Sequence, residues 1–202
     1  MKLGLFGGSF DPVHYGHVRP VEEARRQLGL DRVLYLPTAA PPHKPRRAFA
    51  PALARYAMVE MALLDEPGLW VSPHELTLGR PAYTVETLEH FRRQLPEAAL
   101  HLLVGGDAFV DLPHWVRWRE ILVLARLVVL VRPGWDPTAV LDSLPPELGA
   151  AVAAGRVDWV ENQPVTVSST ELREMLARGE EPPAAAMPPL VVQYIRKYDL
   201  YR

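Results

Sequence analysis

KLGLFGGSFDPVHYGH, residues 2–17, is the stretch that decides the fold. An apolar run of strand length, Leu3–Phe6, leads into the glycine pair Gly7–Gly8, and a helical pattern opens near Gly16 or His17. The order of strand, tight loop and helix is ordinary in α/β proteins. With the next predicted strand, at residues 32–36, it completes a first βαβ unit.

The loop between this strand and helix is suited to a phosphate group. Its glycines let backbone N–H groups approach a ligand, and the helix start adds N–H donors at the positive end of the helix dipole. His14 and His17 bracket Gly16 in a His-x-Gly-His pattern, which holds two imidazoles where the helix begins. The alternative is that both histidines are surface or capping residues. The glycines match neither the GxGxxG fingerprint nor the P-loop, so these two motifs are excluded.

Length and composition favour one α/β domain that spans residues 1–202. The 202 residues are 49% hydrophobic, which is enough for one full-sized core. The net charge of −2 gives no basic surplus, so we expect no binding to nucleic acid or to an anionic membrane. Cysteine is absent, which excludes disulfides, thiolate catalysis and cysteine-bound zinc. We see neither a signal peptide nor a membrane-spanning apolar run and expect a cytoplasmic protein.

Hydrophobic periodicity predicts strands that alternate with helices along the chain. Strands are expected at 3–6, 32–36, 69–72, 100–104, 127–131 and 157–160. Helices are expected at about 17–28, 53–64, 84–95, 168–178 and 189–200, with two short helical patterns between 133 and 155. The segment between the third strand and Tyr83 is turn-rich, and the helical part at 168–202 is expected to pack on the rest of the domain.

A proline-rich segment, residues 37–51, carries several cationic side chains. Its prolines forbid regular structure and bias the chain toward extended turns. Lys44 lies shortly after the carboxyl end of a predicted strand, where open α/β sheets bind their ligands. Arg46 and Arg47, with His43 beside them, are equally well explained as a solvated basic linker.

Three further positions near predicted helix starts are candidates for ligand contacts. Thr84 is expected to cap its helix, and a helix amino end also receives anions. Asp107 follows Gly105 and a predicted strand, which suits ribose hydroxyls, although it could only cap the next helix. Trp115 is a candidate for stacking on a ring, whereas Trp118 is expected to pack in the core.

The segment VSSTELREML gathers donors at another helix start. Ser168 and Glu171 have the spacing of a capping box, which explains these two residues fully. It does not explain Ser169, Thr170 and Arg173. Hydroxyls, free N–H groups and a guanidinium at one helix end suit the oxygens of a polyphosphate.

Several ordered motifs give the chain a resemblance to a known family. They are GGSFDPVHYGH at 7–17, PPHK at 41–44, RPAYTVET at 80–87, GGDAFVDLPHW at 105–115, VSSTELR at 167–173 and VVQYIRKYDLY at 191–201. Together they resemble the HxGH nucleotidyltransferase superfamily, in particular its nicotinate-mononucleotide adenylyltransferases. The likeness extends from Gly7 to the carboxyl end. Ala82 is one departure, because the family often has serine there, and it affects only a minor pocket contact.

The resemblance implies a Rossmann-like, doubly wound and mainly parallel sheet with helices on both faces. It also implies transfer of the adenylyl group of ATP to nicotinate mononucleotide, which gives nicotinate adenine dinucleotide and pyrophosphate in NAD biosynthesis. The catalytic residues it implies are His14, His17, Lys44 and Arg173. The residues it implies for ATP binding are Gly7, Gly8, Ser9, Phe10, His14, His17, Gly105, Asp107, Ser168, Ser169, Thr170 and Arg173. Those it implies for nicotinate mononucleotide are Ser9, Lys44, Tyr83, Thr84 and Trp115.

Such a reaction needs no general base, because the attacking phosphate monoester is largely dianionic near neutrality. Catalysis then consists of positioning and charge stabilisation. Magnesium is expected to arrive with ATP, and no residue is assigned to a metal. The chain could also form a homo-oligomer. Three alternatives stay open: another HxGH enzyme such as phosphopantetheine adenylyltransferase or a cytidylyltransferase, a non-catalytic nucleotide-binding module, and a fragment related to class I aminoacyl-tRNA synthetases.

Overall fold

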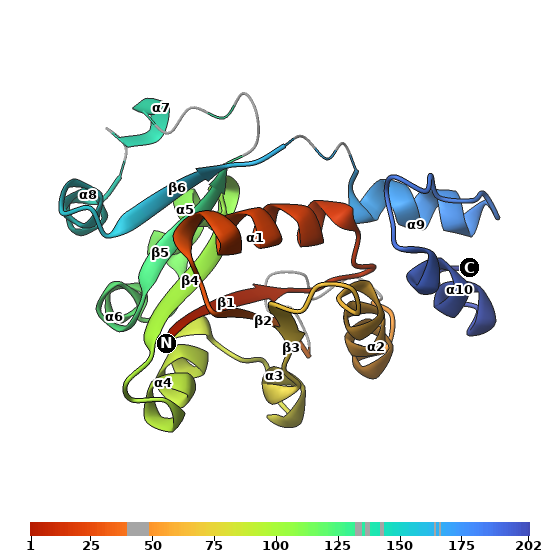
Figure 1. The fold of residues 1–202 in the computed structure, drawn as a ribbon, viewed down its shortest axis with the longest axis horizontal. Coiled ribbons are helices and arrows are strands. Elements are labelled where there is room, and N and C mark those ends of the chain that lie inside the picture. The colour runs from red at the N-terminus through yellow and green to blue at the C-terminus, as the bar shows by residue number, and fades with distance from the viewer. Residues whose placement is uncertain (40–48, 132–134, 136–137, 142–143, 164, 166) are drawn as a thin grey trace.

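The computed structural model describes residues 1–39, 49–131, 135, 138–141, 144–163, 165 and 167–202, and it contains one six-stranded sheet (Figure 1). Each pair of neighbouring strands is parallel, and the strand order is β3-β2-β1-β4-β5-β6. The strands are β1 (Lys2–Gly8), β2 (Arg32–Pro37), β3 (Leu69–Val71), β4 (Ala99–Gly105), β5 (Arg126–Val131) and β6 (Val157–Glu161). This is the order of a doubly wound, Rossmann-like fold, so the predicted fold class is confirmed.

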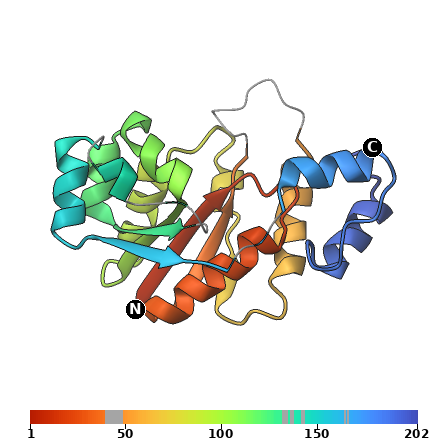
Figure 2. The ribbon, with the colours of Figure 1, turned by 90° about the horizontal axis from the view of Figure 1, so that it is seen from above.

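Helices cover both faces of the sheet, as Figures 1 and 2 show for α1 on one side and α4 and α6 on the other. The first helices are α1 (Tyr15–Leu28), α2 (Ala52–Ala62), α3 (His74–Thr77), α4 (Thr84–Gln94) and α5 (Gly106–Asp111), followed by the 3₁₀ turn η1 (Leu112–His114). The remaining helices are α6 (Trp118–Leu124), α7 (Thr138–Leu141), α8 (Pro146–Ala153), α9 (Ser169–Ala177) and α10 (Pro189–Lys197).

The side chains of the apolar strands form two hydrophobic cores, one on each face of the sheet. On β5, Leu127 and Val129 point into the cluster beneath α4 and α6, whereas Val128 and Leu130 point into the cluster beneath α1. Side chains alternate along a strand, so a strand buried on both faces must be apolar at every position. This explains why the predicted strands read as continuous apolar runs.

The carboxyl-terminal helices extend one end of the molecule. Both views show α9 and α10 near α2, and α10 contacts α2 directly (Figures 1 and 2). Leu172 of α9 and Val191 and Ile195 of α10 are buried in the same cluster as α1. The end of the chain is thereby brought close to the loop that follows β1.

Several details of the secondary structure differ from the sequence prediction. The turn-rich segment after β3 contains the short helix α3. Thr84 is the first residue of α4 and not its cap, because Tyr83 occupies the cap position and keeps an extended backbone. Helix α1 also begins at Tyr15, one or two residues before the start expected near Gly16 or His17, and ends as predicted at Gly29, whose φ of 61° is left-handed.

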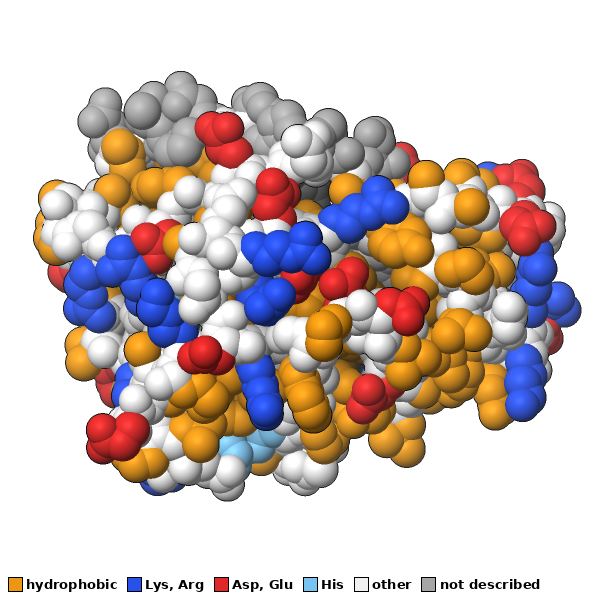
Figure 3. Space-filling view, viewed as in Figure 1, with side chains coloured by type: hydrophobic (Ala, Val, Ile, Leu, Met, Phe, Trp, Pro, Cys, Tyr) orange, Lys and Arg blue, Asp and Glu red, His pale blue; other side chains and the backbone are white. Residues whose placement is uncertain are grey.

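The surface in Figure 3 mixes charges of both signs. On α1, for example, the carboxylate of Glu22 accepts hydrogen bonds from Arg25 at 2.6 Å and from Arg26 at 2.7 Å. Within the described ranges, we find no helix long and apolar enough to cross a membrane.

Candidate active site

The loop after β1 lies where the winding of the sheet reverses. Strand β1 pairs with β2 on one side and with β4 on the other. In open α/β sheets the connections diverge at such a point and leave a crevice at the carboxyl ends of the strands. The His-x-Gly-His segment and Gly105 lie at the carboxyl ends of these central strands, β1 and β4.

The two histidines hold each other in a fixed arrangement at the start of α1. Nδ1 of His14 accepts a hydrogen bond from the backbone N–H of Gly16 at 3.1 Å, and Nδ1 of His17 accepts one from the backbone N–H of His14 at 3.3 Å. The ring centroids are 3.9 Å apart. Because each Nδ1 is an acceptor, each neutral ring carries its proton on Nε2. The capping alternative is therefore correct for Nδ1, and it leaves Nε2–H as the donor of each ring.

Gly16 is required by this arrangement. A Cβ at position 16 would lie 2.8 Å from Cε1 of His14, which is closer than real contacts allow. Any side chain there would push the His14 ring away from the Gly16 N–H. The glycine in His-x-Gly-His thus makes room for an imidazole, in addition to any backbone contact with a ligand.

Phe10 has a buried side chain beneath the loop. It is 1% exposed, and its ring packs edge-on against His17 with 5.4 Å between the ring centroids. The Phe10 ring also contacts the rings of Phe6 and Tyr35. The Phe10 side chain therefore supports His17 from the core, and a contact of Phe10 with ATP, which stays a prediction, would use its backbone.

The start of α9 is attached to the same loop. Arg173 donates to the backbone oxygen of Asp11 at 2.6 Å and to the hydroxyl of Thr170 at 2.9 Å, and Ser169 donates to the backbone oxygen of Pro12 at 3.1 Å. The predicted capping box is confirmed, since Ser168 accepts from the N–H of Glu171. The structure therefore brings the two predicted phosphate-binding segments together.

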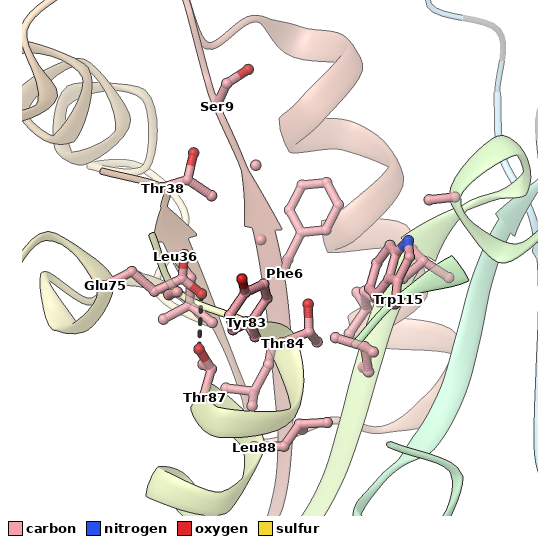
Figure 4. Close-up of a pocket in the computed structure, with 18 of the residues that line it drawn as sticks. Phe6, Ser9, Leu36, Thr38, Glu75, Tyr83, Thr84, Thr87, Leu88 and Trp115 are labelled. Carbon is pink, nitrogen blue, oxygen red and sulfur yellow. Dashed lines mark hydrogen bonds between the residues drawn. The ribbon is translucent and has the colours of Figure 1, made fainter. Parts of the chain in front are cut away.

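A pocket of about 420 Å³ opens beside this loop (Figure 4). Its walls come from the carboxyl ends of β1, β2 and β4, from α3, from the start of α4 and from the segment around η1. The predicted residues that line it are Gly7, Gly8, Ser9, Tyr83, Thr84, Gly105 and Trp115. The Trp115 indole donates to Asp111 at 3.3 Å, whereas Trp118 is buried in the core as predicted.

Asp107 and Lys44 are the predicted residues that remain. Asp107 is exposed in the first turn of α5 and is not part of the pocket lining. Lys44 lies outside the described residues, as do His43, Arg46 and Arg47.

Glu75 is a residue of the pocket that the sequence did not indicate. It lies in α3, is 6% exposed, and accepts a hydrogen bond from the Thr87 hydroxyl at 3.0 Å. Burial raises the pKa of its carboxyl to about 7, although the Thr87 hydrogen bond acts in the opposite direction. A Glu in a turn-rich segment reads as a solvated residue, and its burial depends on the packing of α3 against β2.

Arg55 and Tyr201 were missed for the same reason. Arg55 is 1% exposed, and its guanidinium donates to the backbone oxygens of Ser9 at 2.7 Å and Thr38 at 2.7 Å. It also donates to those of Ala39 and Ala50. Tyr201 donates to Asp11. These residues fix the backbone around the loop after β1, and only a long-range contact could identify them.

The donors gathered at the loop match phosphate oxygens better than a metal ion. They are imidazole, guanidinium, hydroxyl and backbone N–H groups, whereas Mg²⁺ takes oxygen ligands. In the part of the chain that the structure describes, we find no group of three or more His, Cys, Asp or Glu residues placed to hold a metal.

Comparison with known proteins gives consistent matches along the whole chain. A family model described as cytidylyltransferase-like matches residues 5–175. A probable nicotinate-nucleotide adenylyltransferase of Aeromonas hydrophila is 42% identical over 209 residues, which cover 99% of this chain and 97% of the relative. A probable nicotinate-nucleotide adenylyltransferase of Laribacter hongkongensis is 44% identical over 215 residues, which cover 100% of this chain and 95% of the relative.

Solved structures share the fold. A Plasmodium falciparum nicotinic acid mononucleotide adenylyltransferase complexed with NaAD superposes with a TM-score of 0.80 at 16% identity, and the match covers 99% of this chain and 97% of that one. A putative nicotinate-nucleotide adenylyltransferase from Vibrio parahaemolyticus gives a TM-score of 0.69 at 20% identity, covering 100% of this chain and 96% of that one.

Proposed function

The chain belongs to the cytidylyltransferase-like family, among the nicotinate-nucleotide adenylyltransferases, and from this premise we propose how its site works. It transfers the adenylyl group of ATP to nicotinate mononucleotide and releases pyrophosphate. The observation that carries the proposal is the position of the paired histidines and Arg173 at one loop, directly beside the pocket that contains Thr84 and Trp115.

The phosphates of ATP bind at the loop after β1. The Nε2–H groups of His14 and His17 donate to phosphate oxygens, and the first N–H groups of α1 add the positive end of its dipole. Arg173, held against the loop by the Asp11 backbone, supports the pyrophosphate that leaves. We also assign Lys44 to the leaving group, on the strength of the family motif alone.

The nicotinate ring occupies the pocket. Trp115 offers a flat indole on the pocket wall, which suits stacking on a pyridine ring. Thr84 is the first residue of α4, so its hydroxyl and the first N–H groups of the helix can receive the ring's carboxylate. This arrangement favours the acid over the uncharged amide.

The chemistry is an in-line attack of the substrate's phosphate oxygen on the α-phosphorus of ATP. A new P–O bond forms, the bond to the β-phosphate oxygen breaks, and pyrophosphate leaves with the electron pair. The attacking phosphate is largely dianionic near neutrality, so no residue has to remove a proton. The histidines and Arg173 therefore act by positioning the phosphates and stabilising the charge that develops on their oxygens. Magnesium would arrive with ATP, bound through the phosphates and water molecules, and would neutralise part of their charge; we assign no residue of this chain to it.

Pyrophosphate release with ATP and magnesium tests the proposal. Nicotinate mononucleotide, nicotinamide mononucleotide and phosphopantetheine are offered in parallel, each at the same concentration. We expect strong release with nicotinate mononucleotide and little with the other two. Release with phosphopantetheine alone would show that the protein catalyses another HxGH reaction. No release with any of the three at high protein concentration would show that the protein only binds nucleotides.

A further inference from the structure

We propose that Glu75 is a specificity-determining residue whose carboxyl takes up a proton when the substrate's carboxylate enters the pocket. The inference rests on the function proposed above, because it assumes that the pocket receives an anionic ring. It adds a residue that lies outside the motifs quoted above and that the phosphate chemistry does not require.

Glu75 lies on the wall of the pocket. It is the second residue of α3, and its side chain lies on the wall of the cavity with those of Tyr83 and Thr84 (Figure 4). The Thr87 hydroxyl, itself buried, donates to Oε1 of Glu75 at 3.0 Å. Among the described residues this is the hydrogen bond that the carboxyl makes. Glu75 thus lines the same pocket as Thr84 and Trp115, where the ring is proposed to bind.

The charged groups around Glu75 favour the neutral form of its carboxyl. Among the described residues, the titratable side chains on the neighbouring elements contact one another, and none of them forms an ion pair with Glu75. In the described part of the chain Glu86 pairs with Arg80, Glu89 with Arg117 and Asp111 with His114, while His74 stacks on His90. A buried carboxylate with one hydroxyl partner and no cation is costly, so its neutral form is favoured. Burial accordingly raises the pKa of Glu75 to about 7, where both forms are populated near neutrality.

A second negative charge in the pocket changes this balance. Two carboxylates in one pocket repel each other, so nicotinate mononucleotide binds best when Glu75 is neutral. Binding then takes up a proton wherever the free protein has Glu75 ionised. Nicotinamide mononucleotide lacks the ring carboxylate, so its binding does not require Glu75 to be neutral. The preference for the acid over the amide therefore weakens as the pH rises above about 7.

The substitution Glu75→Gln separates this effect from other titrations. Glutamine has nearly the same shape and is neutral at every pH. The readout is kcat/KM for nicotinate mononucleotide in the variant divided by that in the wild type, from pH 6 to pH 9, because titration of the substrate phosphate cancels in this ratio. We expect the ratio to rise about tenfold between pH 6 and pH 8 through KM, since only the neutral fraction of the wild type is competent. A ratio that does not change with pH would overturn the proposal.

Two further measurements test whether the pH dependence comes from the ring carboxylate and from the titration of Glu75. The same ratio for nicotinamide mononucleotide, measured as an inhibitor if it is not turned over, should stay constant, and a parallel rise would contradict a role in recognising the ring carboxylate. Thr87→Val removes the hydrogen bond that favours the charged form, so the pH midpoint of KM should move upward. An unchanged midpoint in a folded Thr87→Val protein would contradict the proposal even if Glu75→Gln did not fold.

The proposed function can fail separately. Turnover of nicotinate mononucleotide by the wild type at pH 6 reports on the reaction alone, whatever Glu75 does. Its absence would refute the function, whereas turnover with a flat ratio would refute only the role of Glu75.

Discussion

The hydroxyl of Tyr201 donates a hydrogen bond to a carboxylate oxygen of Asp11, 2.7 Å away and 190 residues earlier in the chain. The same carboxylate oxygen accepts from the backbone N–H of Ala50 at 3.1 Å, and the backbone oxygen of Asp11 accepts from Arg173 at 2.6 Å. Asp11 therefore links the loop after β1 to α9 and to the end of the chain. Burial and the charge of Asp11 raise the pKa of the Tyr201 hydroxyl, which keeps it protonated as a donor.

Tyr201→Phe should weaken both stability and catalysis. The substitution removes one hydroxyl and leaves the buried Asp11 with one partner fewer, which costs about 1–3 kcal/mol of unfolding free energy. We expect a lower melting temperature and a lower kcat, because the backbone oxygen of Asp11 also holds Arg173 in place. Tyr198→Phe is the matched control, since Tyr198 is exposed. Equal effects of the two substitutions would show that the Tyr201 hydroxyl has no special role.

His17→Ala should lower kcat on the order of 100- to 1000-fold, the scale for one preorganised donor to a developing charge. His90→Ala, on α4 and outside the pocket lining, is the control for loss of an imidazole. Rates are compared at saturating ATP, with ATP affinity measured separately. A loss of less than about fivefold with intact ATP binding would make His17 a structural residue.

Gly16→Ala should separate helix stability from activity. Alanine favours a helix over glycine by about 1 kcal/mol, but the new Cβ would displace the His14 ring. We expect kcat to fall even if the melting temperature holds. Gly149→Ala, in α8 and with open space around its Cβ, should raise stability slightly and leave kcat as it is. Full activity of Gly16→Ala would show that the His14 position is not needed.

Glu75 should make the stability of the ligand-free protein depend on pH. Its pKa is about 7 in the folded state and near 4.5 in the unfolded chain, so folding favours the protonated form. The stabilisation that this provides is present below about pH 4.5 and is lost as the pH rises to 7, in total about 3 kcal/mol. Denaturant titrations of the wild type and Glu75→Gln should show the variant gaining relative stability over this range and then levelling off. A difference that is constant from pH 4.5 to 8 would place the Glu75 carboxyl in contact with water.

Trp115→Ala should raise KM for nicotinate mononucleotide while leaving KM for ATP almost unchanged. Stacking of a base on an aromatic side chain contributes about 1–3 kcal/mol, which corresponds to about 5- to 150-fold in KM. Trp115→Phe keeps a flat ring and should lose less. The control is Trp70→Phe on β3, outside the pocket. An equal rise in both KM values would place Trp115 in a general structural role.

Local sequence determined the elements of this fold and part of its chemistry. The apolar run before Gly7 predicted β1, and the spacing of Ser168 and Glu171 predicted the start of α9. His14 and His17 were found because His-x-Gly-His is a local pattern in which the residues that must interact are three apart. Such features depend on neighbours along the chain, and neighbours are visible in a sequence.

Tertiary structure alone decided which distant residues share the site. Arg173 meets Asp11 across 162 residues, and no periodicity records that contact. Glu75 reads as a polar residue in a turn, and its position on the pocket wall depends on where α3 packs. Its pKa follows from that burial and from the one hydrogen bond from Thr87, both of which arise only when separate segments fold together. The sequence therefore determined the donors and the frame, whereas the charge state of the pocket is a property of the folded chain.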